Sequence, residues 1–196
     1  MRIKLATVLI CAFGLFVNKQ IVGGADVSRF KWAAEAADLK KFKKQLKEQG
    51  VKSQAVLKGF GFMHYAVKVK RNEKLNKRKD FIKYLLKQGA SINEKDLSED
   101  TPLHVLAQTE DFYGDLQKKI LSLIKFLVKN KADVNAKNKY GDSPLYFALK
   151  AKNFDIAKFL IQKRAIIDDK ALKITKDNKM KKYLEKEMKK QKARKK

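Results

Sequence analysis

The sequence predicts an all-α fold, a solenoid of stacked helix-turn-helix units closed by a C-terminal capping helix. One four-residue phrase returns along the chain, as Gly61-Phe62-Met63-His64, Thr101-Pro102-Leu103-His104 and Ser143-Pro144-Leu145-Tyr146. Each copy is followed by an apolar helical pattern, and the ends of these patterns also resemble one another, in segments 84–93, 126–135 and 159–168. A unit that recurs at this length buries its apolar face by stacking on its neighbours.

Composition limits the class of protein. The length of 196 residues suits one folded domain with appendages, and a hydrophobic content of 44% argues against disorder throughout. The net charge of +26 predicts attraction to polyanions, although lysine used as the default surface residue explains it equally well. Because Cys11 is the only cysteine, a disulfide framework and a thiolate zinc site are both excluded.

The N-terminus predicts a signal peptide over residues 1–25. Arg2 and Lys4 precede an apolar run over residues 5–17, which is too short to cross a bilayer comfortably and fits a signal-peptide core. Small residues follow, and cleavage is expected after Ala25. We therefore expect a secreted or periplasmic protein. The alternatives are an uncleaved segment that anchors the chain in a membrane and a buried apolar N-terminal helix.

The first unit is predicted over residues 27–57 and the second over 58–94. In the first, alanines between residues 33 and 37 allow close helix approach, and Asp38 is placed to cap the second helix. In the second, Gly61-Phe62 stands where the later phrases have Thr-Pro or Ser-Pro, so the start of this helix is expected to be less secure.

The third unit is predicted over residues 95–136 and the fourth over 137–168. Thr101 is placed as an N-cap, and Pro102 at the first helical position has no N–H group to leave unpaired. Residues 138–141 form a turn that ends in a glycine. Residues 96–99 fill the same place without one, so this turn is expected to be strained or differently shaped.

Residues 169–196 are predicted to close the stack. Leu172, Ile174, Met180, Tyr183, Leu184 and Met188 give an apolar stripe at helical spacing, as in a half-repeat or a capping helix. The other face of this segment is polar, which a terminal unit of a solenoid requires. A basic tail follows from residue 186 to residue 196.

The Thr-Pro-Leu-His phrase resembles the ankyrin repeat, over roughly residues 27–168 and most strongly over 96–168. The resemblance implies units of a turn and two antiparallel helices. It also implies that the histidine of the phrase hydrogen-bonds backbone across neighbouring turns, which makes His64 and His104 structural rather than catalytic or metal-binding.

The resemblance further implies that a protein partner binds the turn tips and the faces of the first helices. In this chain the residues concerned are Leu97, Ser98, Glu99, Asp100, Lys139, Tyr140, Asp142, Phe147 and Lys150. Tyr140 is the foremost of them, because an exposed tyrosine on a rigid turn is a typical hot-spot residue. Phe112 and Tyr113, in the insertion at 109–115, are either exposed anchors for a partner or side chains that pack the insertion onto the helices.

Two basic segments predict a second kind of site. The stretch at 68–79 reads as a basic loop between the helices of the second unit, and the tail is rich in lysine. The candidate contacts to phosphate or lipid headgroups are Lys68, Lys70, Arg71, Lys77, Arg78, Lys79, Lys189, Lys190 and Arg194. A solvated loop and a frayed helix explain the same residues, and the tail has no aromatic residue for base stacking.

These observations predict an exported, non-catalytic module that binds another protein as a monomer. The alternative is a protein that binds a polyanion, either nucleic acid or an anionic membrane surface, through the tail and residues 68–79. No nucleophile–base pair, paired carboxylates, phosphate loop or metal-ligand cluster stands out in the sequence. We therefore expect no enzymatic activity, no cofactor, no metal and no small-molecule substrate.

Overall fold

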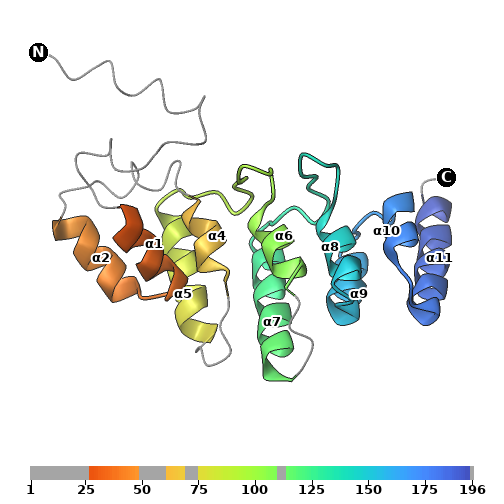
Figure 1. Ribbon diagram of the computed structural model, residues 1–196, viewed down its shortest axis with the longest axis horizontal. Coiled ribbons are helices and arrows are strands. Elements are labelled where there is room, and N and C mark those ends of the chain that lie inside the picture. Colours follow the sequence, from red (N-terminus) through yellow and green to blue (C-terminus); the bar gives the residue numbers. More distant parts are fainter. Residues whose placement is uncertain (1–26, 49–60, 69–74, 110–113, 195–196) are drawn as a thin grey trace, which may run out of the picture.

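The computed structural model describes residues 27–48, 61–68, 75–109 and 114–194, which form ten helices and no strand. The helices make an elongated stack, with α1 and α2 at one end and α10 and α11 at the other (Figure 1). This confirms the predicted all-α solenoid. The helices are α1 (Val27–Glu35), α2 (Leu39–Glu48), α4 (Phe62–Ala66), α5 (Leu75–Lys87), α6 (Pro102–Ala107), α7 (Asp115–Lys129), α8 (Pro144–Lys150), α9 (Phe154–Gln162), α10 (Asp169–Ile174) and α11 (Asn178–Ala193).

The helices form two layers. The first-helix layer consists of α1, α4, α6, α8 and α10, and each of these helices packs on the next. The second-helix layer consists of α2, α5, α7, α9 and α11, and its first four members pack in the same order. The long connections before α6 and α8 project together from one side of the stack (Figure 1).

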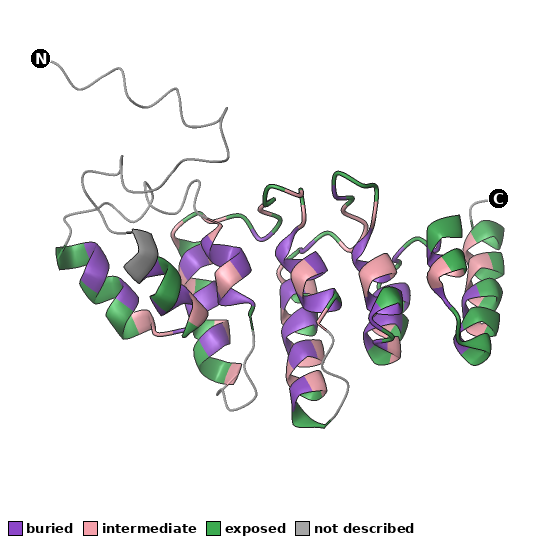
Figure 2. Ribbon diagram, viewed as in Figure 1, coloured by how far each residue is buried: buried purple, intermediate pink, exposed green. Residues whose placement is uncertain are grey.

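The hydrophobic core lies between the layers and changes in character along the stack. At the N-terminal end it is aromatic: the rings of Phe42 and Phe81 have centroids 5.1 Å apart, and those of Phe42 and Phe62 are 5.5 Å apart, both edge to face. Such pairs add stabilisation beyond their burial. From α6 onward the buried side chains are mostly leucine and isoleucine, and Figure 2 shows this buried seam continuing between the layers.

Short polar side chains start the helices as the sequence predicts. Asp38 Oδ1 accepts the Lys41 N–H at 2.9 Å, which confirms the predicted cap of α2. Ser143 Oγ accepts the Tyr146 N–H at 3.3 Å at the start of α8. Thr101 stands at the predicted N-cap position of α6. There the ring of His104 takes part in the cap, because its Nδ1 accepts the Thr101 N–H at 3.0 Å.

The second unit begins differently. Gly61 precedes α4 in the left-handed conformation and provides no side-chain cap, and α4 has only five residues. The Glu94 carboxylate from the following connection lies over this end. Its pKa is raised by burial, partly offset by the nearby His64 and by the backbone of Gly61 and Met63. The weak helix start expected at Gly61 is therefore held from the neighbouring connection.

The two turns at 96–99 and 138–141 have the same shape. The Glu99 N–H donates to the Asp96 carbonyl and the Gly141 N–H to the Asn138 carbonyl, each at 2.9 Å. Glu99 has φ 59° and Gly141 has φ 73°. Of the two forms expected for the turn without glycine, the structure shows the strained one, because Glu99 takes a left-handed conformation that favours glycine.

Two helices close the stack. Asp168 Oδ1 accepts the Ala171 N–H at 2.9 Å and starts α10, which packs on α8 as α8 packs on α6. The predicted capping helix is α11, and it runs to Ala193. Most of the basic tail is therefore an ordered helix rather than a frayed end.

Several predictions concern residues outside those that the structure describes. These are the signal peptide at 1–25, Phe112 and Tyr113 in the insertion, and Lys70 and Arg71 in the basic segment. Over the described ranges, no helix combines the length and apolar character needed to cross a bilayer. The same residues contain no group of three or more histidine, cysteine or acidic side chains arranged to hold a metal ion.

Candidate interaction surface

The turns before α6 and α8 are bonded to one another. The Lys139 N–H donates to the Ser98 carbonyl at 3.0 Å, and Asn138 Nδ2 donates to Asp100 Oδ1 at 2.8 Å. The side chain of Asn138 also accepts the N–H groups of Tyr140 and Asp142, at 3.0 and 2.9 Å. The two turns therefore form one continuous surface with a fixed backbone.

The histidines tie α4 and α6 each to the next turn. His64 Nε2 lies 2.7 Å from the Asp100 carbonyl, and His104 Nε2 lies 3.2 Å from the Asp142 carbonyl. Both histidines are buried. The structural role expected from the resemblance is confirmed by these hydrogen bonds across neighbouring turns.

A lysine from α10 holds the second of the two turns. Lys170 Nζ, on α10, donates to the Tyr140 carbonyl at 2.6 Å and to Asp142 Oδ1 at 2.8 Å. The hydrogen bond to Asp142 is the main reason why the pKa of Lys170 is raised. The second turn is thus fixed from both sides, by the first turn and by α10.

We define the turn-tip surface as Leu97, Ser98, Glu99, Lys139 and Tyr140. Leu97 is 78% exposed and Tyr140 is 62% exposed, and both are large apolar side chains. Lys139 Nζ lies 5.0 Å from the centre of the Tyr140 ring. The surface therefore offers two apolar anchors and a cation on a backbone that needs no rearrangement before binding.

The other predicted contact residues of this group have different surroundings. Asp100 and Asp142 are half-buried, and each already accepts hydrogen bonds at its carbonyl and its carboxylate, so they support the turns. Phe147 is half-buried, with its ring edge-on to His104 at 5.8 Å and to Tyr146 at 5.6 Å. Lys150, at the end of α8, is exposed.

Sequence reasoning missed a second set of hydrogen bonds between neighbouring repeats, which side-chain amides make. Asn93 Oδ1 accepts the Asp133 N–H at 2.8 Å, and Asn135 Oδ1 accepts the Ile166 N–H at 2.8 Å. Their Nδ2 groups donate to the carbonyls of Lys131 and Arg164, at 3.3 and 3.2 Å. The signal was present in the sequence, because the two asparagines end two copies of the repeated phrase at 84–93 and 126–135.

Comparison with known families agrees with this geometry. The family described as ankyrin repeats, in three copies, matches residues 63–171, which is more than half of the chain. The chain belongs to the ankyrin-repeat family. A search of curated proteins found no match. The family match indicates a protein–protein interaction module, and ankyrin repeats are typically non-catalytic.

The prediction that Arg78 contacts a polyanion is wrong. Arg78 is fully buried, and its guanidinium donates to the Ala66 carbonyl at 2.6 Å and to the Glu35 carbonyl at 2.8 Å. Arg78 therefore joins α5 to the ends of α4 and α1 and is not accessible to a ligand. The segment predicted as a loop is also shorter, because α5 begins at Leu75.

The remaining described residues of the basic segment differ in accessibility: Lys68 and Lys77 are exposed, and Lys79 is half-buried. Lys68 pairs with Glu35 at 3.4 Å, and Lys79 Nζ donates to Ser122 Oγ at 3.0 Å. Lys77 is exposed on α5. On α11, Lys189 is exposed and Lys190 pairs with Glu187 at 2.7 Å; Arg194, which follows the helix, is exposed.

Basic residues of the ankyrin stack are concentrated in the second-helix layer. Five lysines and one glutamate lie on α2, four lysines and one aspartate on α7, and seven lysines and two glutamates on α11. By contrast, α4 and α6 carry no lysine, arginine or acidic residue, and α1, α8 and α10 carry at most two basic residues each. In the second-helix layer, α9 is the exception, with one lysine and one aspartate. The two layers therefore present surfaces of different electrostatic character.

Proposed function

We propose that this chain is a non-catalytic module that binds another protein through its turn-tip surface. The observation that carries the proposal is the exposure of Leu97 and Tyr140, at 78% and 62%, on turns joined by the Lys139–Ser98 backbone hydrogen bond. Exposed apolar side chains on a rigid frame contribute most to an interface, because little conformational entropy is lost when they are buried.

The bonding behind the surface supports the same proposal. His104 and Lys170 hold the second turn from behind, so the side chains of Lys139 and Tyr140 remain free to face a partner. A tyrosine contributes apolar area and a hydroxyl that can hydrogen-bond, and the neighbouring lysine favours a partner with an acidic group near an apolar pocket.

Site-specific photo-crosslinking tests this proposal. A photoreactive residue at position 97 or 140 should trap a protein partner, whereas the same residue at position 125 on α7 should not. The captured partner is then titrated against a Leu97→Ala, Tyr140→Ala double variant, and the affinity should fall at least a hundredfold if both side chains are hot spots.

Two lysines offer a matched control. Lys139 lies over the Tyr140 ring, and Lys125 on α7 lies 5.8 Å from the centre of the Phe159 ring. Lys139→Ala should weaken binding, and Lys125→Ala should leave it unchanged. Equal crosslinking from position 125, or wild-type affinity of the double variant, would reject the turn-tip surface.

We further propose that the protein is exported and acts as a monomer outside the cytoplasm. The support is the charged start, the short apolar run and the small residues in segment 1–25. N-terminal sequencing of the protein recovered from the medium or the periplasm should begin at Asp26. Recovery of the chain from the cytoplasm with residues 1–25 intact would contradict export.

A second candidate function is binding to a polyanion. It is favoured by the lysines of the second-helix layer, which recur from α2 to α11. A surface of one sign raises the local concentration of an oppositely charged polymer, and its binding weakens steeply as salt rises. This candidate uses another side of the molecule from the turn-tip surface, so the two functions are compatible.

A further inference from the structure

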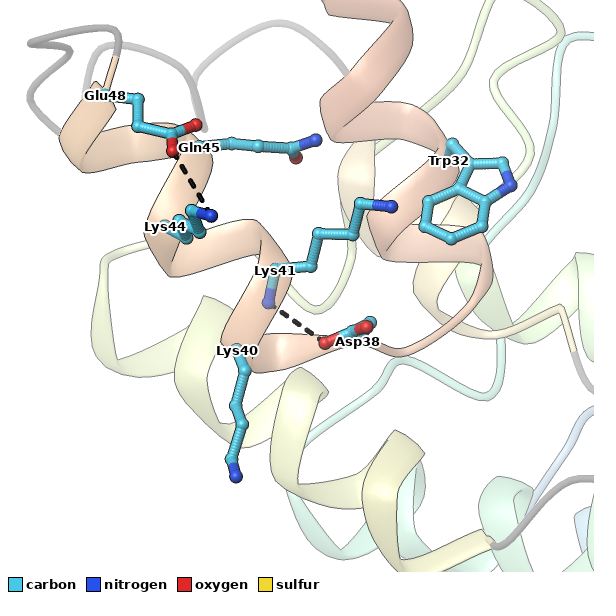
Figure 3. Close-up of a pocket in the computed structure, with 7 residues that line it drawn as sticks. All are labelled: Trp32, Asp38, Lys40, Lys41, Lys44, Gln45 and Glu48. Atoms are coloured by element: carbon cyan, nitrogen blue, oxygen red, sulfur yellow. Dashed lines mark hydrogen bonds and ion pairs between the residues drawn. The ribbon is translucent and has the colours of Figure 1, made fainter.

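A pocket of about 800 Å³ lies at the N-terminal end of the stack, between α1 and α2. We call it the Trp32 pocket; its lining residues are Trp32, Asp38, Lys40, Lys41, Lys44, Gln45 and Glu48. Figure 3 shows Lys41 and Gln45 reaching from α2 toward Trp32 on α1, whereas Lys40 points away from it. This place is distant along the chain from the turn-tip surface.

The aromatic part of the pocket is a half-exposed indole. Trp32 is 53% exposed, although large aromatic side chains are usually covered. Lys41 Nζ lies 3.9 Å from the centre of its ring. A cation held over one face of an exposed indole can contact an anion, and a flat group that stacks on that face must displace it.

The polar part of the pocket contains a buried group with no partner. Gln45 is only 7% exposed, and its Oε1 atom accepts no hydrogen bond within the described part of the chain. A buried acceptor without a donor costs free energy, which a ligand N–H group would recover. The pocket therefore selects for a ligand that carries hydrogen-bond donors.

The carboxylates of the pocket are already engaged. Asp38 accepts the Lys41 N–H at 2.9 Å as the cap of α2, and Glu48 pairs with Lys44 at 3.6 Å. Lys40 and Lys41 line the pocket as well, so its lining holds three lysines and two carboxylates. The charge left for a ligand at this end of the stack is therefore positive.

We propose that the Trp32 pocket binds a nucleotide unit, either free or within a single-stranded nucleic acid. Its base stacks on Trp32, a donor on the base edge meets Gln45 Oε1, and the phosphate meets Lys41 and the lysines beside it. All three chemical features of the pocket are used by this one ligand class. A phosphatidylglycerol headgroup offers hydroxyl donors for Gln45 but has no flat ring that could stack on Trp32.

The test uses the full chain, because Trp32 is its only tryptophan and reports directly on the pocket. The probes are an oligoadenylate of about ten nucleotides, adenosine monophosphate, and phosphatidylglycerol vesicles. Titration with oligoadenylate should quench the tryptophan fluorescence as the base stacks. Quenching by the monophosphate as well would mean that one unit suffices, and quenching by the oligomer alone would mean that the strand contributes.

Variants are compared by anisotropy of labelled oligoadenylate. Trp32→Leu should weaken binding about tenfold, because the base no longer has an indole on which to stack. Lys41→Ala should weaken binding and reduce its salt dependence by the amount that corresponds to about one phosphate. Lys173→Ala, an exposed lysine on α10 at the other end of the stack, is the matched control and should bind as the unchanged chain does. Circular dichroism checks that each variant is folded.

Three results would overturn the proposal. The first is saturable binding of oligoadenylate that leaves the tryptophan fluorescence unchanged, and the second is wild-type affinity of the folded Trp32→Leu variant. The third is a fluorescence change with vesicles but with neither nucleotide probe, which would make the pocket a membrane contact.

Discussion

His104 shows how one side chain fixes both a helix start and the spacing between repeats. Its Nδ1 accepts the Thr101 N–H at 3.0 Å, so Nδ1 carries no proton. Its Nε2 therefore carries the proton and donates to the Asp142 carbonyl at 3.2 Å. A second proton, on Nδ1, would place the Nδ1–H group against the Thr101 N–H group. Burial lowers the pKa of His104, which agrees with a ring that must stay neutral.

This arrangement predicts that acid weakens the stack. Because the pKa of His104 is lower in the folded chain than the ordinary 6.5, its contribution to stability is complete above pH 6.5 and is lost as pH falls toward the folded-state pKa. The free energy of unfolding should therefore fall between pH 7.5 and 5.5, by at most about 1.4 kcal/mol per pH unit. Urea unfolding at a series of pH values measures it.

His104→Gln is the control for this prediction. The amide can accept from Thr101 and donate to Asp142 but does not titrate in this range. Glu94 shifts stability in the opposite direction, because burial raises its pKa, and it is unchanged in the variant. The pH dependence should flatten in His104→Gln. If the free energy of unfolding depended on pH as steeply in the variant as in the unchanged chain, titratable groups other than His104 would cause the acid destabilisation.

Glu99 provides a prediction about backbone strain. It has φ 59° at the place where the sister turn has Gly141, and its side chain pairs with Lys95. Glu99→Gly should relieve the strain, whereas Glu99→Gln removes only the ion pair. We expect the glycine variant to exceed the glutamine variant by about 0.5–1 kcal/mol in the free energy of unfolding. Equal stability would mean that the turn is unstrained.

Residue types predicted some roles well and others poorly. Asp38, Ser143 and the two histidines were predictable, because caps and repeated phrases depend on neighbours in sequence. Arg78 was not predictable as part of a basic run. Once α5 is known to begin at Leu75, Arg78 falls on the same helix face as Phe81, Ile82 and Leu85, and this periodicity directs it inward.

At the scale of the element, α11 is more than a carrier of lysines. Gln191 Nε2 donates to the Ala165 carbonyl at 2.8 Å, and its Oε1 accepts the Ile167 N–H at 3.3 Å. A glutamine from the tail thus gives the last connection the pair of hydrogen bonds that Asn93 and Asn135 give the earlier ones. The tail is consequently part of the fold.

We expect Gln191→Ala to lower the free energy of unfolding by about 1–2 kcal/mol, since two partly buried hydrogen bonds to backbone are removed. Lys189→Ala, an exposed position on the same helix, should change it by less than about 0.5 kcal/mol. Chemical denaturation of both variants measures the difference. Equal stability of the two variants would show that the hydrogen bonds of Gln191 are not needed for the fold. Removal of residues 186–196 would then test the binding role of the tail without destabilising the chain.

The element order could be predicted more completely than the elements at the ends. The two phrases with proline start α6 and α8 where expected, because a capping residue followed by proline defines a helix start. Two helices in the closing segment were not foreseen. Their starts depend on Asp168 and Asp177, which are common caps outside any repeated phrase.

At the scale of the whole molecule, the two layers separate two kinds of surface. The turn tips and first helices offer rigid apolar anchors, and the second helices offer lysines that repeat along the stack. The repeated phrases predicted the architecture, because stacking depends on local pattern. They could not predict this segregation of charge, because it appears only when the second helices align side by side.

The segregation predicts where a polyanion binds. Lys87, Lys125 and Lys158 are exposed on α5, α7 and α9, and replacing all three with alanine should reduce the salt dependence of binding to double-stranded DNA. The slope of log affinity against log salt should fall by about 0.9 for each DNA phosphate that the variant no longer neutralises. Replacing Lys139, Lys150 and Lys173, which lie on the turn and first-helix side, changes the net charge equally. A filter-binding salt series compares the two triple variants. If the second variant reduced the slope as much as the first, the net charge rather than one face of the solenoid would determine binding.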